Sequence, residues 1–415
     1  MCIRDSRFSP SVIDRLATSV YRIEAVATCH PIYSSLGTQS LLPESFETYQ
    51  IVRPADIVFR LTDLQNDKRS LRTAIVKELG IITSAYLAAK PTGIQAHYLS
   101  YLLRAYDVTK VFYSMGGGLR QSMKFADIKR LPTLVPPVAE QTAIATFLDR
   151  ETAKIDGLIA EQEKLIALLA EKRQATISHA VTKGLNPAAT MKDSGVAWLG
   201  EVPAHWEISR LKFVASVQTG IAKGKDNSGR KTIEVSYLRV ANVQDGYLAL
   251  DDIAKIEIPA DELPRYLLRP GDVLMNEGGD FDKLGRGHLW NGEIEDCIHQ
   301  NHVFAVRPNA ISSEWLNRVT SSNAAQFYFM SRSKQSTNLA SISSTNVMEL
   351  PLPLPPNEEQ AVIVSFLDTE TTRLDALTAE ATHGIALLKE RRSALISAAV
   401  TGKIDVRHLA EAEAA

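Results

Sequence analysis

The stretch LPTLVPPVAEQTAIATFLDRETAKIDGL, residues 131–158, occurs a second time as LPLPLPPNEEQAVIVSFLDTETTRLDAL, residues 350–377. When the two copies are aligned at a shift of 219 residues and extended to 182 and 401, about 28 of 52 positions are identical. Solenoid repeats have much shorter periods, about 20–50 residues. The sequence therefore predicts a duplicated half-protein, with one copy of this element in each half.

Each copy predicts an extended lead-in followed by one long helix. Prolines fix φ and lack an N–H, so the Pro-rich start is expected to be non-helical. The pairs Glu140-Gln141 and Glu359-Gln360 suit a first helical turn, where the helix dipole favours negative charge. No proline follows for more than forty residues, and Gly184 and Gly402 are expected to end the helices. About 43 helical residues would span about 65 Å.

Apolar residues at heptad-like spacing predict a narrow seam along each helix. The predicted seam positions are Leu148, Ile155, Leu158, Leu165 and Leu169 in the first copy, and Leu367, Leu374, Leu377, Leu388 and Leu395 in the second. A lone helix of this length cannot bury its seam, whereas two matching helices in one chain can bury each other's. We therefore expect a coiled coil. The alternative is that these are unrelated core helices of two domains.

The regions before the two Pro-rich runs also correspond to each other. RPADIVFRLTDLQNDKRS (53–70) and RPGDVLMNEGGDFDKLGRGHLW (269–290) each read as an Arg-Pro turn, a β-rich run and a polar loop. A second strand-like run follows, ending in Lys-Pro or Arg-Pro, and then helical stretches. The order of elements matches, but the polar loops do not. We expect two mixed α/β domains with a common framework, each of which recognises a different target.

These patterns divide the chain into six segments. We predict a first α/β domain over 1–137, a long helix over 138–184, a linker over 185–197, a second α/β domain over 198–356, a second long helix over 357–403 and a tail over 404–415. The opening MCIRDS is expected to be a cloning or assembly scar, and the first domain is expected to be truncated at its N-terminus.

Composition narrows the class of protein. The chain has 415 residues, which is too long for one ordinary core, and its 45% hydrophobic and 23% charged content is normal for a soluble protein. No apolar run is long enough to span a membrane. Three scattered cysteines, Cys2, Cys29 and Cys297, suit a reducing cytoplasm. The net charge of −2 hides 17 Lys or Arg against 11 Asp or Glu in residues 1–137, which is only a weak indication of DNA binding.

Four phrases in order carry a family resemblance over nearly the whole chain. They are WLGEVPAHWEISRLK (198–212), GDVLMNEGGDFDKLGRGHLW (271–290), LPLPLPPNEEQAVIVSFLD (350–368) and ERRSALISAAVTGKIDV (390–406). Together with the duplication, they make the chain similar to the DNA-specificity subunits of type I restriction–modification systems.

The resemblance implies a non-catalytic subunit with two α/β target-recognition domains. Each domain is expected to read half of an interrupted, asymmetric site in double-stranded DNA. The two spacer helices are expected to pack antiparallel about a pseudo-twofold axis, to set the gap in the site and to dock two methyltransferase subunits. Two restriction subunits would complete the complex. No cofactor is expected on this chain; S-adenosylmethionine, ATP and Mg²⁺ are expected on the partners.

A spacer of about 65 Å corresponds to about two turns of B-DNA, so two heads can reach successive major grooves. Arg suits guanine edges, and Asn and Gln suit adenine. The diverged loops supply such residues, some of which can instead contact phosphates or only water. The candidate DNA-binding residues are Arg60, Gln65, Asn66, Lys68, Arg69, Arg120 and Gln121 in the first half, and Asn276, Lys283, Arg286, His288, Lys334 and Asn338 in the second.

Catalytic motifs were sought as an alternative. Asn186-Pro187-Ala188-Ala189 lacks the second proline and the aromatic residue of an amino-methyltransferase motif, and no phosphate-binding glycine motif occurs. The pair His299 and His302 beside Cys297 lacks a second ligand pair for zinc. Asp280, Asp282 and Lys283 are too close together for a usual nuclease site. A self-contained DNA-modifying or cleaving enzyme, and a scaffold that binds only proteins, stay open as alternatives.

Overall fold

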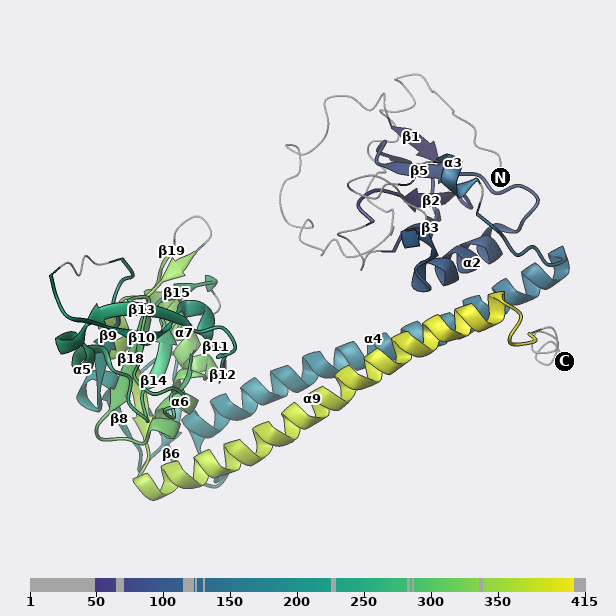
Figure 1. Cartoon of the computed structure of the whole chain (residues 1–415). Coiled ribbons are helices and arrows are strands. Elements are labelled where there is room, and N and C mark those ends of the chain that lie inside the picture. Colours follow the sequence, from purple (N-terminus) through teal and green to yellow (C-terminus); the bar gives the residue numbers. More distant parts are fainter. Residues whose placement is uncertain are drawn as a thin grey trace, which may run out of the picture. The chain divides into compact units, whose positions relative to one another are not determined.

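The computed structural model describes residues 49–64, 71–114, 123, 125–129, 131–224, 229–281, 284–285, 287–335 and 339–406 (Figure 1). The chain divides into two compact units. Unit 1 comprises Met1–Glu163 and Thr382–Ala415, and unit 2 comprises Lys164–Ala381. Each unit therefore holds one head of mixed α/β structure together with parts of both long helices.

The two long helices are α4 (Val138–Lys183) and α9 (Asn357–Val400). Both begin at the residue that the Pro-rich lead-in predicts. Gly184 follows α4 directly with φ +72°, and its N–H donates to Ala180 O at 3.1 Å. This left-handed glycine is a usual helix stop, because a residue without Cβ adopts positive φ at little cost.

The head of unit 1 is built on a three-stranded antiparallel sheet in the order β3-β2-β5, with a separate pair β1-β4. Its helices cover a core around Phe59, Leu103 and Phe112. The elements are β1 (Gln50–Val52), β2 (Ile57–Arg60), β3 (Thr73–Ile75), β4 (Gly80–Ile82), β5 (Tyr86–Ala89), α2 (Ala96–Val108), η2 (Val111–Ser114) and α3 (Phe125–Ile128).

The head of unit 2 is built on a four-stranded antiparallel sheet in the order β16-β14-β18-β9, and a second sheet has the order β13-β10-β17. The elements that precede the first sheet's central strand are β6 (Met191–Asp193), β7 (Glu201–Pro203), β8 (Glu207–Arg210), η3 (Leu211–Phe213), β9 (Ala215–Thr219), β10 (Thr232–Leu238), η4 (Val240–Asn242), β11 (Val243–Gln244), β12 (Tyr247–Leu248), β13 (Ala254–Pro259), η5 (Ala260–Glu262) and α5 (Leu263–Tyr266). The remaining elements are β14 (Val273–Asn276), β15 (Gly278–Gly279), β16 (Gly287–Leu289), β17 (Cys297–His299), β18 (Val303–Pro308), α6 (Ser313–Thr320), α7 (Asn323–Arg332), β19 (Lys334–Gln335), β20 (Ala340–Ser341), α8 (Ser344–Met348) and β21 (Pro351–Leu354).

The central strands β2 and β14 start in the same way in the two heads. Each follows an Arg-Pro turn in which the aspartate Oδ2 accepts a hydrogen bond from the arginine N–H. The distance is 2.9 Å from Arg53 to Asp56 and 2.8 Å from Arg269 to Asp272. Asp272 additionally holds the guanidinium of Arg307 at 2.7 Å. The matched motifs in the sequence thus form matched strand starts.

A buried glutamine at the start of each long helix holds the head that precedes it. Gln141 Oε1 accepts from Gln95 N at 2.8 Å, while its Nε2 donates to Pro136 O at 2.7 Å. Gln360, 219 positions later, does the same with Ser312 N at 3.4 Å and Pro355 O at 2.9 Å. Gln95 and Ser312 cap helices α2 and α6 with their side chains. The glutamine therefore joins the Pro-rich lead-in, the long helix and the head.

An aspartate further along each long helix receives a second contact from the head. Asp149 accepts a hydrogen bond from the hydroxyl of Tyr101 on α2 at 2.8 Å. Asp368, the equivalent residue on α9, forms an ion pair with Arg318 on α6. The donor changes between the halves, but the acceptor and its position do not.

Within each unit, one end of α4 packs against the opposite end of α9. In unit 1, residues near the start of α4 cluster with residues near the end of α9: Ile144, Ala145, Phe147, Leu148, Ile396, Ala399 and Val400. In unit 2, residues near the end of α4 cluster with residues near the start of α9: Ile177, Ala180, Val181, Ile363, Val364 and Leu367. Six positions in one cluster correspond to six in the other at the 219-residue shift.

The predicted seam needs correction in the middle of the helices. Leu148, Ile155, Leu169, Leu367 and Leu374 are buried, and Leu388 and Leu395 are half-buried. Leu158, Leu165 and Leu377 are exposed by 53%, 42% and 38%, so the prediction that they lie in the seam is wrong in this structure.

The less exposed positions in the middle of α4 follow a different register from the predicted one. After Ile155 the less exposed positions are Ile159, Gln162, Ile166 and Leu169, which follow alternating steps of four and three residues. Apolar residues are adjacent at 158–159 and 165–166, so spacing alone allows two registers. The equivalent residues Thr152 and Thr371 are also buried, so the buried positions of these helices include polar residues as well as leucine and isoleucine.

Candidate nucleic-acid interface

Two loops that are distant in sequence leave the head of unit 2 from one small sheet. β20 pairs with β15 through Gly278↔Ser341 and Gly279↔Ala340, and it pairs with β19 through Lys334↔Ser341. Ile342 N also donates to Glu277 O at 2.9 Å. One loop follows β15 and the other lies between β19 and β20. The structure therefore brings the stems of the two predicted DNA-reading loops together.

The head of unit 1 brings the stems of its two predicted loops together in a related way. Leu61, which enters the first loop, accepts a hydrogen bond at its carbonyl from the N–H of Met123, which leaves the second loop, at 2.9 Å. The side chain of Arg72, which closes the first loop, reaches Tyr113, which enters the second. The sequence predicted both loops but not the contacts between their stems.

Four of the thirteen predicted DNA-binding residues lie in the described part of the chain. Arg60 is the last residue of β2 and Asn276 the last of β14; His288 is in β16 and Lys334 is in β19. The other nine lie outside the described residues: Gln65, Asn66, Lys68, Arg69, Arg120, Gln121, Lys283, Arg286 and Asn338.

Asn276 and His288 are half-buried side chains at the base of the first loop of unit 2. Asn276 Nδ2 donates to Val243 O at 2.8 Å. Burial lowers the pKa of His288, and this neutral imidazole lies on the strand facing Leu274. Both side chains have an atom buried without a hydrogen-bond partner, Asn276 Oδ1 and His288 Nδ1. Lys334, in contrast, is exposed on the small sheet, where a cation can reach a phosphate.

The residues considered for zinc binding separate in the fold. His299 is fully buried and its Nδ1–H donates to Val303 O at 2.7 Å, while His302 Nδ1 lies 2.6 Å from the carboxylate of Glu277. Burial raises the pKa of the Cys297 thiol to about 12. Within the described ranges, no group of three or more His, Cys, Asp or Glu side chains is arranged to hold a metal ion.

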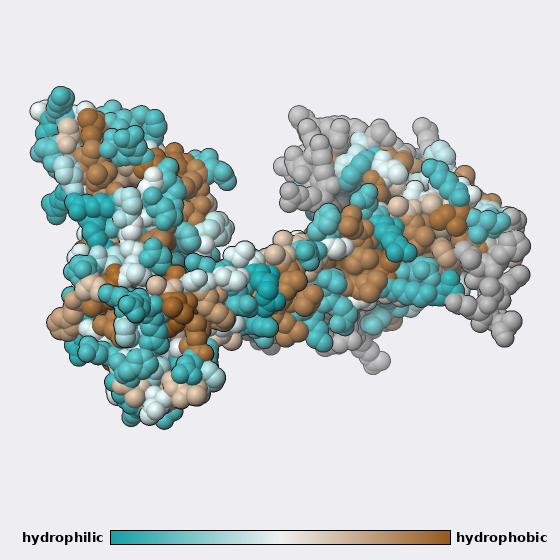
Figure 2. All heavy atoms as spheres, turned by 90° about the horizontal axis from the view of Figure 1, so that it is seen from below, coloured by the Kyte–Doolittle hydropathy of each residue, from teal (hydrophilic) through white to brown (hydrophobic). Residues whose placement is uncertain are grey.

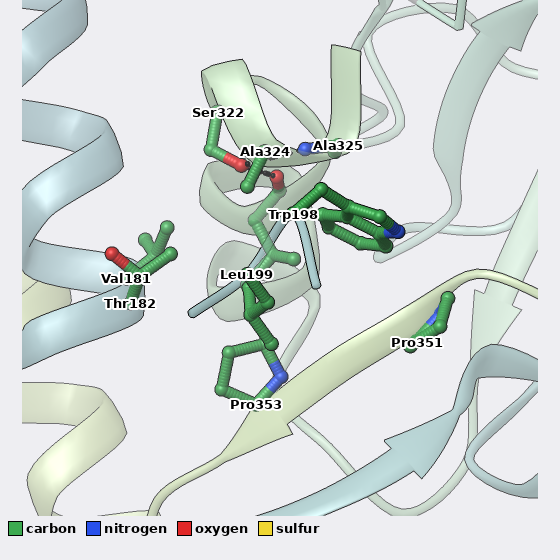
Figure 3. Close-up of a pocket in the computed structure, with 10 residues that line it drawn as sticks. Val181, Thr182, Trp198, Leu199, Ser322, Ala324, Ala325, Pro351 and Pro353 are labelled. Carbon is green, nitrogen blue, oxygen red and sulfur yellow. Dashed lines mark hydrogen bonds between the residues drawn. The ribbon is translucent and has the colours of Figure 1, made fainter. Parts of the chain in front are cut away.

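A small hollow in unit 2 is lined by apolar and uncharged residues (Figure 3). Trp198 and Leu199, from the turn before β7, lie between α6, α7 and the prolines of β21, and Ser322 Oγ accepts from Ala325 N at 3.2 Å beside them. The lining has no group that transfers protons at neutral pH. The hollow therefore reads as the packing of this turn rather than as an active site.

Hydrophobic residues also reach the surface of the long helices (Figure 2). Leu158 and Leu377 are equivalent exposed positions, as are Leu168 and Leu387, which are exposed by 52% and 51%. In each helix the two residues are ten positions apart, which places them about 80° from each other around the helix axis. Apolar residues that recur at equivalent exposed positions are typical of an interaction surface. Among the helices in the described ranges, none is both long and apolar enough to cross a membrane.

The sequence reasoning missed the residues that hold the heads. Gln141, Gln360, Asp149 and Asp368 all fall at identical positions of the repeat, and their identity in both copies was the available signal. Arg72 had no such signal, because a buried arginine cannot be told from a solvated one in a loop rich in charge.

Comparisons with known proteins agree with this arrangement. Residues 203–385 match the family model described as the type I restriction modification DNA specificity domain. The chain is 24% identical over 322 residues to the type I restriction enzyme StySPI specificity subunit of Salmonella potsdam, covering 77% of this chain and 67% of that protein. It is 24% identical over 330 residues to the EcoKI specificity subunit of Escherichia coli K12, with the same coverage.

A solved structure has a similar fold. A chain from a study of complex assembly and conformational transition in the type I R-M system superimposes with a TM-score of 0.62 and 18% identity, covering 85% of this chain and 83% of that one. The repeated helices, the two matched heads and these similarities lead to one conclusion: the chain is similar to the DNA-specificity subunits of type I restriction–modification systems.

Proposed function

We propose that this chain is the DNA sequence-recognition subunit of a type I restriction–modification enzyme, and that each head reads one half of an interrupted, asymmetric site. The observation that carries the proposal is that, in each head, the stems of two polar loops meet in the described structure. The β15-β20-β19 sheet joins the stems in unit 2, and the bond from Met123 N to Leu61 O joins the stems in unit 1. Loops that diverge on matched frames suit two readers of different sequence.

The long helices act as the spacer between the two readers. We infer that they pair as an antiparallel coiled coil about a pseudo-twofold axis. The support is that contacts within unit 1 recur within unit 2 at equivalent positions, including Leu148 and Leu367 at the centres of their clusters. Because both helices have fixed lengths, the gap between the half-sites would be fixed as well.

The partners follow from the family. Specificity subunits of type I restriction enzymes are the named relatives of this chain, and we propose double-stranded DNA, two methyltransferase subunits and two restriction subunits as its partners in the cytoplasm. The exposed pairs Leu158 with Leu377 and Leu168 with Leu387 are the surface on which the two methyltransferase subunits would dock. S-adenosylmethionine, ATP and Mg²⁺ would bind on the partner subunits.

The chain itself is proposed to be non-catalytic. The hollow beside Trp198 lacks ionisable side chains, and the comparisons favour a specificity subunit over a self-contained DNA enzyme. Purified chain incubated with DNA and either S-adenosylmethionine or Mg²⁺ should neither methylate nor cleave it. Turnover by homogeneous protein would contradict this part of the proposal.

The decisive experiment is co-expression with the methyltransferase subunit encoded beside this chain, followed by mapping of methylated bases in the host DNA. One interrupted motif with a single gap length is the expected result. Methylation at an uninterrupted motif, or a stable complex that methylates without base preference, would contradict two readers on a fixed spacer.

A further inference from the structure

Arg72 is a fully buried arginine at the start of β3, inside the head of unit 1. Removing a guanidinium from water costs several kcal/mol unless its donors are satisfied by well-placed acceptors. Among the described residues it donates to three acceptors: Nη1 to Thr62 O at 2.9 Å, Nη2 to Asp63 O at 3.3 Å, and Nε to the Tyr113 hydroxyl at 3.3 Å. The position of these acceptors explains why an arginine is buried here.

The acceptors belong to the stems of two different loops. Thr62 and Asp63 lie just before residues 65–70, which hold Gln65, Asn66, Lys68 and Arg69 of the predicted reading surface. Tyr113 lies just before residues 115–122, which hold Arg120 and Gln121. One guanidinium therefore ties together the entry stems of both loops, while the backbone of Arg72 itself closes the first loop through Arg60 N, which donates to Arg72 O at 2.8 Å.

The arginine is itself held from several sides. Its N–H donates to the buried carboxylate of Asp107 on α2 at 2.5 Å. Its Cζ lies 5.3 Å from the centre of the Tyr113 ring, and Lys110 Nζ lies 4.7 Å from the same centre. Asp63 adopts φ +58°, a left-handed backbone that turns the chain where its carbonyl meets the guanidinium.

In the second head, the stems of the two corresponding loops are joined by backbone hydrogen bonds instead. There the loop stems are joined by the β15-β20-β19 ladder, through Gly278, Gly279 and Ala340. In unit 1 the backbone link is the bond from Met123 N to Leu61 O, and the side chain of Arg72 adds a second link, with two bonds to the first stem and one to the second.

We propose that Arg72 is a positioning residue that fixes the stems of the two predicted DNA-reading loops of the first head relative to each other, and so sets the base preference of one half-site without contacting DNA. This inference rests on the proposed function of the loops. A planar guanidinium can serve three acceptors in three directions, whereas a lysine ammonium on a flexible stem cannot hold the same geometry. Arg72→Lys should therefore restore only part of what Arg72→Met loses.

The test compares Arg72→Met, Arg72→Lys and the wild-type chain in complex with its methyltransferase subunit, by selection from DNA duplexes randomised over the mapped motif. Arg72→Met should lower the base preference of one half-site by about tenfold, the size of one lost base discrimination, and leave the other half-site unchanged. Arg104→Met is the matched control, because Arg104 donates to Thr73 O at 3.2 Å and not to the loop stems. A folded Arg72→Met protein with the preferences of the wild type would overturn the proposal.

Hydrogen exchange of the same proteins without DNA tests whether Arg72 couples the two loop stems, independently of the loops' function. Arg72→Met should speed amide exchange in peptides covering 58–64 and 111–114 together, whereas Arg104→Met should not. Faster exchange in only one of the two peptides would mean that Arg72 does not couple the stems. If Arg72→Met does not fold, Tyr113→Phe removes one acceptor of the three and should give a smaller change in the same direction. A wild-type complex without any base preference would refute the proposed function. The exchange comparison would still decide whether Arg72 couples the two stems.

Discussion

Arg392 and Asp156 form a two-point ion pair, with Nε 2.8 Å from Oδ1 and Nη2 3.1 Å from Oδ2. An equivalent ion pair joins Arg173 and Asp375, with Nε 3.1 Å from Oδ1. Asp375 is the 219-residue equivalent of Asp156, and Arg392 is the equivalent of Arg173. Each pair lies within one unit and joins α4 to α9, so the duplicated sequence forms the same cross-helix contact twice.

These ion pairs should contribute more to helix register than to stability. Their side chains are partly exposed, and exposed pairs are worth about 0.2–1 kcal/mol. We expect Arg392→Glu to destabilise the chain by about that amount, and the charge reversal Asp156→Arg with Arg392→Glu to restore most of it. Urea unfolding of the two single variants and the double variant measures the coupling. Arg391→Glu, at the exposed neighbouring position, is the control; an equal loss there would mean that the pair itself is not responsible.

Gln141 and Gln360 should each contribute more to the free energy of unfolding than an exposed ion pair does. Gln141→Ala leaves the partly buried Gln95 N–H and Pro136 O without this partner, and the loss of a hydrogen-bond partner at a buried group costs about 1–3 kcal/mol. Gln360→Ala should behave alike for Ser312 and Pro355. Glu140→Ala, at the half-buried neighbouring position, serves as the matched control. Urea unfolding in which Gln141→Ala and Glu140→Ala coincide would show that the glutamine does not hold the head.

Substitution of two leucines on α9 allows an effect on core packing to be distinguished from an effect on partner binding. Leu367 is fully buried, so Leu367→Ala should cost about 2–5 kcal/mol of unfolding free energy. Leu377 is 38% exposed, so Leu377→Ala should change stability by no more than about 0.5 kcal/mol. We expect Leu377→Ala, together with Leu158→Ala, to weaken binding of the methyltransferase subunit in a titration of purified components. Unchanged binding by a stable double variant would move the docking surface elsewhere.

Acid should destabilise unit 2 through the buried His299 and the half-buried His288. Burial lowers the pKa of His299, although the carbonyls of Val303 and Gln300 oppose the shift, and burial also lowers the pKa of His288. The unfolded chain binds protons at these rings from about pH 6.5 downward, while the folded chain does not. Stability therefore falls as the pH drops below about 6.5 and levels off only once the folded pKa is passed.

The measurement is the unfolding free energy between neutral pH and about pH 5. His299→Gln keeps a donor for Val303 O but cannot titrate, so it should flatten part of the pH dependence, with His288 accounting for a remaining slope of the same sign. His383→Gln, at an exposed position of α9, is the control. An unchanged slope in His299→Gln would show that this histidine is not the group that titrates.

The sequence by itself determined the duplication, the two long helices and the presence of two related heads. These features are local or depend on identity at a fixed shift: prolines exclude helix before 138 and 357, and a left-handed glycine ends α4 at Lys183. The strand starts were also visible, because an Arg-Pro-x-Asp turn forms from four adjacent residues. The family resemblance rested on the same kind of contiguous information.

Only the tertiary structure decided which residues are inside. Adjacent apolar residues at Leu158 and Ile159 offered two seam registers, and the choice depends on the partner helix rather than on spacing. The burial of Arg72 depends on three acceptors from two loops that lie about fifty residues apart in the chain. A charged residue can be placed in the interior only when distant groups satisfy its donors, and that condition is set by the folded arrangement, not by the neighbours in sequence.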